Sequence, residues 1–118
     1  MLPLNTNQIP ALFKKAGNLA RSGKPDEALK VLAQLQTMAP NRAEVPFQIA
    51  QIHQQMGRTD AALKAYGHAA RLAPAEITVW RAYVNLALGL DASARNMVAK
   101  QLKTSKLPGA ELKRLTSL

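Results

Sequence analysis

Few side chains in this sequence are of the kinds that carry out catalysis. Its 118 residues include two histidines, His53 and His68, and no cysteine. A zinc site or an acid–base pair needs several such groups close together, so we expect His53 to serve in packing and His68 to lie on an exposed helix surface. No serine stands in a Gly-x-Ser-x-Gly motif, and no glycine-rich phosphate-binding loop occurs. The sequence therefore predicts a protein that is not an enzyme and has no metal site and no cofactor.

Charge is the stronger chemical signal. Sixteen lysines and arginines outnumber seven acids, and the net charge of +9 favours an acidic partner. After residue 90 there are two acids and six basic residues: Arg95, Lys100, Lys103, Lys106, Lys113 and Arg114. This stretch has no interleaved aromatic residues and no base-reading motif, so we expect a solvated basic face and no nucleic-acid partner. Non-specific, charge-driven binding of anions remains an alternative.

The overall composition favours helices. Hydrophobic residues make up 47% of the chain but aromatic residues only 4%, so the core must consist mainly of alanine and aliphatic side chains. No run reaches the roughly 18 apolar residues that span a bilayer. Residues 1–15 also have the wrong order of basic and apolar residues for a signal peptide. We therefore expect a cytoplasmic, all-α protein that makes no use of a membrane.

Two landmarks recur at a fixed spacing. Pro40, Pro74 and Pro108 follow one another at intervals of 34 residues, each after an apolar pattern typical of a helix. Gly23 and Gly57 are also 34 residues apart. Glycine can end a helix in a left-handed conformation, and acidic residues shortly after it favour the start of another helix. Each repeat is thus predicted to be a pair of helices.

The apolar periodicity predicts seven helices and no strand. Their expected ranges are 8–22, 25–38, 43–56, 59–72, 77–89, 92–105 and 109–117. Ala28 and Ala62 fall at equivalent positions, where a methyl side chain lets paired helices approach closely. Leu32 and Tyr66, one turn later, are expected to fill the remaining space.

This pattern resembles the tetratricopeptide repeat, a helix–turn–helix unit that stacks into a right-handed solenoid. The second copy carries the most matches: Ala50, Gly57, Asp60, Ala62, Tyr66, Ala69, Leu72 and Pro74. We assign one domain, residues 1–118, with repeats at about 9–42, 43–76 and 77–108 and a capping helix at 109–118. The resemblance implies an all-α superhelix of three helix–turn–helix repeats with a short C-terminal cap.

The third repeat departs from this pattern. Trp80 occupies the tryptophan position of the family, but Gly89 follows Gly57 by 32 residues. In this register Ala94 corresponds to Ala62. We expect a turn that is two residues short and a helix pair with an altered crossing.

In this family the first helices of the repeats line a concave face that receives a peptide or a partner helix. The resemblance places ten candidate binding residues there: Phe13, Lys14, Arg21, Phe47, Gln48, Gln51, Gln54, Gln55, Arg81 and Asn85. Amides can bond to a peptide backbone, and arginine can bind a carboxylate in bidentate fashion. The prediction is a protein-interaction scaffold with a protein or peptide ligand, and a solvated helix face is the alternative for the glutamines.

One ligand known for the family is not expected. Its two-carboxylate clamp for chaperone tails needs basic and amide side chains at four positions of the first and fifth helices. Here these positions hold Phe13, Gly17, Thr78 and Ala82.

A looser likeness concerns the ends of the chain. Residues 8–13, the three repeats and the closing Leu-Pro-Gly-Ala-Glu-Leu resemble the N-terminal repeat region of bacterial proteins that fuse such repeats to a sulfotransferase-like domain. This likeness implies a docking or dimerisation arm of a larger enzyme. The apolar stripe of Leu112, Leu115 and Leu118 is consistent with further chain after Leu118. A homodimer that seals an exposed solenoid end is a further expectation.

Overall fold

The computed structural model describes residues 8–116, which form seven helices. In chain order they are α1 (Gln8–Arg21), α2 (Pro25–Met38), α3 (Glu44–Gln55), α4 (Thr59–Leu72), α5 (Ile77–Leu88), α6 (Ala92–Leu102) and α7 (Gly109–Thr116). Within residues 8–116 there is no strand, and no helix there has the length and apolar character needed to cross a bilayer. Positions 117 and 118, which the sequence assigned to the cap, lie outside the described residues.

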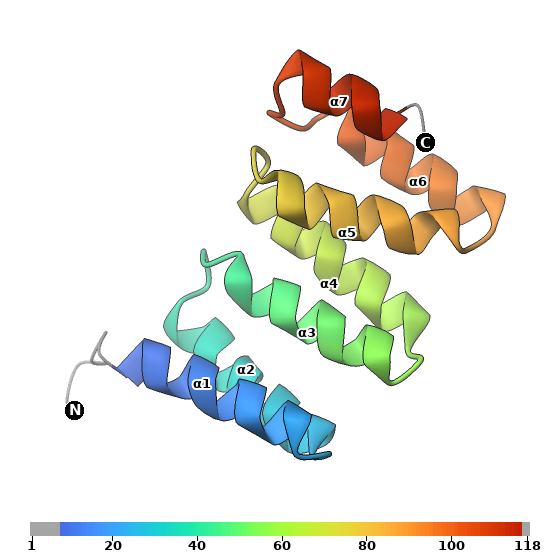
Figure 1. Cartoon of the computed structure of the whole chain (residues 1–118). Helices are drawn as coiled ribbons and strands as arrows, with labels where there is room; N and C mark the ends of the chain where they lie inside the picture. Colours follow the sequence, from blue (N-terminus) through green and yellow to red (C-terminus); the bar gives the residue numbers. More distant parts are fainter. Residues whose placement is uncertain (1–7, 117–118) are drawn as a thin grey trace.

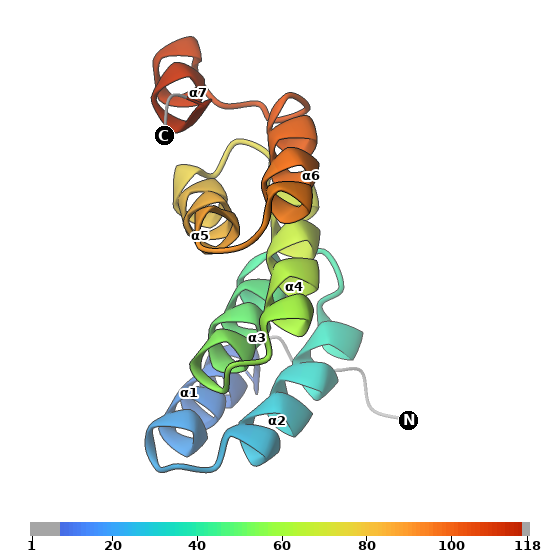
Figure 2. The ribbon, with the colours of Figure 1, turned by 90° about the vertical axis from the view of Figure 1, so that its right-hand side faces the viewer.

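The helices stack into an elongated array of two layers (Figure 1). Figure 2 shows α1, α3, α5 and α7 in one layer and α2, α4 and α6 in the other. Helices α1 and α2 pair, as do α3 and α4, and the pairs are joined where α3 packs on α2 and α5 packs on α4. The array measures 48 × 28 × 19 Å, with α1 and α7 at opposite ends. The predicted all-α solenoid with a short cap is confirmed.

The first two pairs are joined by turns that require glycine. Gly23 and Gly57 have φ angles of 78° and 75°. In each turn the next backbone N–H reaches back to close the helix end: Lys24 N–H donates to Leu19 O at 2.9 Å, and Arg58 N–H donates to His53 O at 2.8 Å. This arrangement is the Schellman motif, in which the left-handed residue satisfies the last carbonyls of the helix. The predicted role of both glycines is confirmed.

The third connection is built differently. Gly89 has a φ of −84°, which any residue adopts. Because α5 ends at Leu88 and α6 begins at Ala92, the connection is as long as the other two, and the expected short turn is wrong. The two missing positions are instead taken from the facing ends of the two helices. The Asp91 side chain caps α6 by accepting a hydrogen bond from Ala94 N–H at 2.9 Å.

Helix α6 is shorter than the sequence predicts and ends at Leu102 rather than at 105. The Thr104 hydroxyl donates to Gln101 O at 2.6 Å, and Lys106 N–H donates to Pro74 O at 2.8 Å. The second bond ties the chain after α6 to the loop between α4 and α5. Since this N–H is used across the array, it does not extend the helix.

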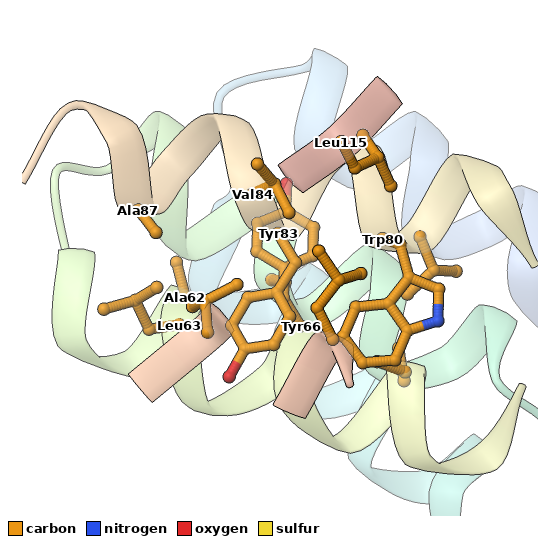
Figure 3. Packing of buried hydrophobic residues seen from close by; sticks show 14 of the residues in the cluster. Ala62, Leu63, Tyr66, Trp80, Tyr83, Val84, Ala87 and Leu115 are labelled. Atoms are coloured by element: carbon orange, nitrogen blue, oxygen red, sulfur yellow. The ribbon is translucent and has the colours of Figure 1, made fainter. Parts of the chain in front are cut away.

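The core consists of two apolar clusters that meet at α3. The smaller one joins α1, α2 and one face of α3, and it contains Ala28 and Leu32 with no exposed surface. The larger one runs from the other face of α3 to α7 and includes Ala62, Tyr66 and Trp80 (Figure 3). Ala62 has no exposed surface either, as expected where paired helices approach closely.

Helix α7 covers only part of its end of the array. Leu112 and Leu115 pack against the larger cluster, as expected for a cap. The backbone of α7 approaches α5 but scarcely approaches α6, whereas α3 lies along α2 and α5 lies along α4. Figure 2 shows the separation between α7 and α6. One face of α6 is therefore left without a helix against it.

Candidate partner-binding groove

A groove with a volume of about 340 Å³ lies between α1 and α3, within the layer of odd-numbered helices. Its lining combines small or aliphatic residues with polar ones: Ala16, Gly17, Ala20, Arg21, Gln48, Gln51, Ile52 and Gln55. Ala16 and Ile52 are buried and form the floor, while Arg21, Gln51 and Gln55 are exposed along the rim. No acidic residue lines the groove.

The three amides form a row along α3. Gln48, Gln51 and Gln55 are spaced three and four residues apart, which places them on one face of the helix. At 1.5 Å per residue, successive amides are about 4.5–6 Å apart along the axis. An extended peptide presents equivalent backbone groups about every 6.6–6.8 Å. The row can therefore donate to and accept from successive backbone groups of an extended chain laid along it.

Arg21 lies at the end of α1 with its guanidinium folded over Gly17. A Cβ built at Gly17 would lie 3.5 Å from Arg21 Nη1, and Arg21 Nη2 donates to Asn18 Oδ1 at 2.6 Å. Among residues 8–116, Arg21 makes no salt bridge. The bare backbone at Gly17 thus gives the guanidinium room beside the groove. Its planar fork matches a carboxylate.

Three predicted site residues serve in packing. Phe13 is half-buried against the smaller core cluster. Phe47 packs edge-on against Tyr66, with ring centroids 5.7 Å apart, and lines a different hollow next to α5. Gln54 Oε1 accepts a hydrogen bond of 2.7 Å from the Tyr66 hydroxyl. None of the three lines the α1–α3 groove.

The other predicted residues lie elsewhere on the surface. Lys14 is exposed and lines a separate hollow with Lys15 and Lys24. Arg81 and Asn85 are exposed on α5, outside the groove. Of the ten candidates, the structure brings four together, namely Arg21, Gln48, Gln51 and Gln55.

Sequence analysis assigned the floor of the groove to the core alone. Ala16, Ala20 and Ile52 carry the apolar periodicity of buried residues, and periodicity does not tell which of them border an open groove. The available signal was composition: Ala16, Gly17 and Ala20 give one face of α1 almost no side-chain volume. A partner backbone can therefore approach α1 closely.

The histidines form no site. His68 is half-buried, contrary to the exposed position expected for it, because its Nδ1 accepts a hydrogen bond of 3.3 Å from Gln36 Nε2 on α2. His53 is half-buried, and its Nδ1 has no hydrogen-bond partner. Burial, and then the nearby Arg58 charge, lower the pKa of His53 below its usual 6.5, although Asp26 opposes this. Across residues 8–116, no three His, Asp or Glu side chains gather in a way that could hold a metal ion.

Comparison with known proteins identifies the family. The sequence model of the tetratricopeptide repeat matches residues 19–86, more than half of the chain. The chain therefore belongs to the tetratricopeptide repeat family. No curated protein has a sequence that matches it.

Solved structures with the same fold include chaperones of type III secretion. Yersinia enterocolitica SycD, in complex with a peptide of the translocator YopD, aligns with a TM-score of 0.71 at 19% identity and covers 94% of this chain and 78% of its own. PcrH, in complex with the chaperone binding region of PopB, aligns with a TM-score of 0.71 at 18% identity and covers 99% and 98%. A point mutant of MamA aligns with a TM-score of 0.65 at 18% identity and covers 97% and 76%. At this level of identity the likeness concerns the fold.

Proposed function

We propose that this chain is a protein-interaction module that holds an extended segment of a partner protein in the α1–α3 groove. The three glutamines of α3 bind the backbone of the segment, and Arg21 binds one of its carboxylates. The observation that carries the proposal is the lining: three amides in a row and an arginine, with no acid, beside small side chains of α1. The partner's own side chains provide the bulk that α1 lacks.

The charge around α1 supports an acidic segment. No acid precedes Asp26 in the sequence, whereas Lys14, Lys15, Arg21 and Lys24 are all basic. All four are exposed. Exposed charges of one sign chiefly accelerate encounter with an oppositely charged partner, while the groove itself supplies specificity.

Two relatives in fold support a peptide ligand. SycD has been solved with a peptide of YopD, and PcrH with the chaperone binding region of PopB. Both are chaperones that bind a segment of another protein. For the present chain we propose the same kind of ligand, an extended segment of a protein, without assigning those partners to it.

The proposal gives the chain a binding role and no catalytic step, and it places the chain in the cytoplasm. The polar atoms of the groove are amides and a guanidinium, which are poor proton carriers near neutral pH. They can position a ligand by hydrogen bonds and charge.

Peptide selection tests the proposal. Short random peptides displayed on phage are selected on the chain, and isothermal titration calorimetry measures the affinity of the selected peptide. Arg21→Ala is expected to weaken binding roughly tenfold, because a charge-assisted hydrogen bond is lost. Gln51→Ala is expected to weaken it about fivefold through loss of neutral hydrogen bonds.

Two variants serve as matched controls. Gln34→Ala removes an exposed amide from α2, and Arg81→Ala removes an exposed guanidinium from α5. Both should leave the affinity within about twofold of the wild type. Equal losses from Arg21→Ala and Arg81→Ala would move the site away from the α1–α3 groove.

A further inference from the structure

A second groove lies at the opposite end of the array. Its volume is about 230 Å³, and its apolar lining comes from three helices: Val84, Ala87 and Leu88 of α5, Val98 and Leu102 of α6, and Leu115 of α7. Arg95, Asn96 and Ala99 of α6 complete it. Unlike the α1–α3 groove, it offers mainly aliphatic surface. We call it the end groove.

The earlier repeats show what such a groove receives. Burial aligns α6 with α4 at an interval of 32 residues, so that Ala99 corresponds to Gly67. Gly67 is buried under α5, and a Cβ built there would lie only 3.0 Å from Tyr83 Oη. Ala99 is exposed, because α7 approaches α5 and scarcely approaches α6. The face of α6 that borders the end groove thus corresponds to a face that in α4 is covered by a helix.

The charge at this groove specifies the helix further. At the position that corresponds to the buried Leu63 of α4, α6 has the exposed Arg95. Lys103 follows two turns later along the same side of α6 and is also exposed. No acid lines the groove, and the nearest acid along α6, Asp91, is engaged at the helix N-terminus by Ala94 N–H. An apolar floor with a basic rim fits a helix that has an apolar stripe and acidic flanks.

A second copy of the chain fits less well. Within residues 8–116, the large apolar side chains that are exposed are Leu88 and Met97, at 39% and 41%. Both belong to this same end of the array, so no other surface offers an apolar stripe to insert. Contact between two such ends would bring the basic rims together and repel. We therefore propose that the end groove binds an amphipathic helix of a partner protein, with an apolar stripe that contacts Leu88 and Val98 and an acidic residue that pairs with Arg95.

A designed peptide provides the probe. It is a short helical peptide with leucines spaced three and four residues apart, glutamates on both flanks and a fluorescent label, and anisotropy reports its binding. Two further versions replace every glutamate by lysine or place a proline in the middle of the helix. The glutamate peptide should bind saturably, and each of the other two should bind at least about tenfold more weakly.

Paired variants locate the binding. Leu88→Asn changes an exposed apolar residue of the end groove, and Met97→Asn changes a similarly exposed one outside it. Leu88→Asn should weaken binding about tenfold and Met97→Asn less than about twofold. Arg95→Glu and the exposed Lys64→Glu of α4 alter the net charge equally, and only Arg95→Glu should weaken binding by a similar factor. Circular dichroism verifies that each variant keeps the wild-type helix content.

Several results would overturn the inference. They are equal binding of the lysine and glutamate peptides, equal effects of the paired variants, and the lack of saturable binding. A concentration-dependent dimer in light scattering that Leu88→Asn dissociates and Met97→Asn does not would assign the groove to a second copy instead. The α1–α3 groove is tested separately, since Arg21→Ala should leave the affinity for this peptide unchanged.

Discussion

The second and third helix pairs arise from the same repeat but are packed differently. Helices α3 and α4 approach each other closely over most of their length, whereas α5 and α6 do so over much less of it. Ala62 of α4 has no exposed surface, while its counterpart Ala94 of α6 is half-buried. Two residues fewer between the buried faces therefore preserve the helices but loosen their contact.

The difference in packing has a consequence for binding surfaces. The tightly packed pair α3–α4 presents its polar row to α1 and is covered by α5 on its next side. The looser pair α5–α6 leaves Arg95 and Ala99 exposed beside an apolar groove. The same repeat thus yields an amide-rich groove at one end of the array and an aliphatic one at the other.

The largest expected difference between the pairs is in tolerance of added volume. Ala62→Leu is expected to lower the free energy of unfolding by about 1–3 kcal/mol, because the added atoms have no room between α3 and α4. Ala94→Leu is expected to cost less than about 1 kcal/mol, since half-buried sites accommodate added atoms more easily. Urea unfolding followed by circular dichroism measures both. Equal losses would show that the third pair is packed as tightly as the second.

The two turns should respond to alanine with opposite signs. Gly57→Ala places a Cβ at φ 75° and is expected to cost about 1–2 kcal/mol. At Gly89 the φ is −84°, and an added Cβ would have Leu86 O as its nearest neighbour, at an ordinary 3.6 Å. Gly89→Ala should therefore stabilise the chain by about 0.4–1 kcal/mol through a less flexible unfolded state. A loss at both positions, measured by urea unfolding, would refute the assigned difference between the turns.

The third connection relies on a side chain where the second relies on glycine. Asp91→Ala removes the hydrogen bond to Ala94 N–H and is expected to cost about 1 kcal/mol. Asp60 lies in the first turn of α4, where no side-chain hydrogen bond caps the helix. Asp60→Ala loses only the interaction with the helix dipole, about 0.3–1 kcal/mol at low ionic strength. Thermal unfolding at low and high salt separates the two, because salt should diminish mainly the Asp60 effect.

Much of the fold could be predicted because its determinants are local. The intervals between prolines and the two glycines placed every helix within a few residues. The end of α6 was missed because the Lys106 N–H is used by Pro74, a contact between segments far apart in the sequence. His68 was misplaced for the same reason, since its partner Gln36 is 32 residues away in the preceding pair.

The groove was less predictable than the helices. Helical periodicity indicates which face of a helix a residue occupies, and it correctly set Gln48, Gln51 and Gln55 on one face. It does not tell which neighbour the face meets, so Gln54 could not be distinguished from the row although it bonds to Tyr66. The end groove gave no sequence signal, because it results from where α7 lies relative to α6.

The smallest expected difference between the two pairs is their response to pH. His53 of α3 is half-buried with no partner for Nδ1, while the corresponding position of α5 is the apolar Ala87. Because burial and the Arg58 charge lower the pKa of folded His53 below 6.5, the unfolded chain takes up its proton first. The contribution to stability is thus complete above 6.5 and is lost as the pH falls through 6.5 toward the lowered pKa.

His53→Gln should flatten this dependence. Urea midpoints measured between about pH 7.5 and 5.5, a range above the usual pKa of carboxylates, isolate the histidine contribution. The wild type should lose stability across this window, and the variant should lose less. If both lose the same amount, the proton taken up on unfolding belongs to another group. A wild type that gains stability on acidification would mean that folded His53 binds a proton more tightly than the unfolded chain does, which its unpartnered Nδ1 and the nearby Arg58 argue against.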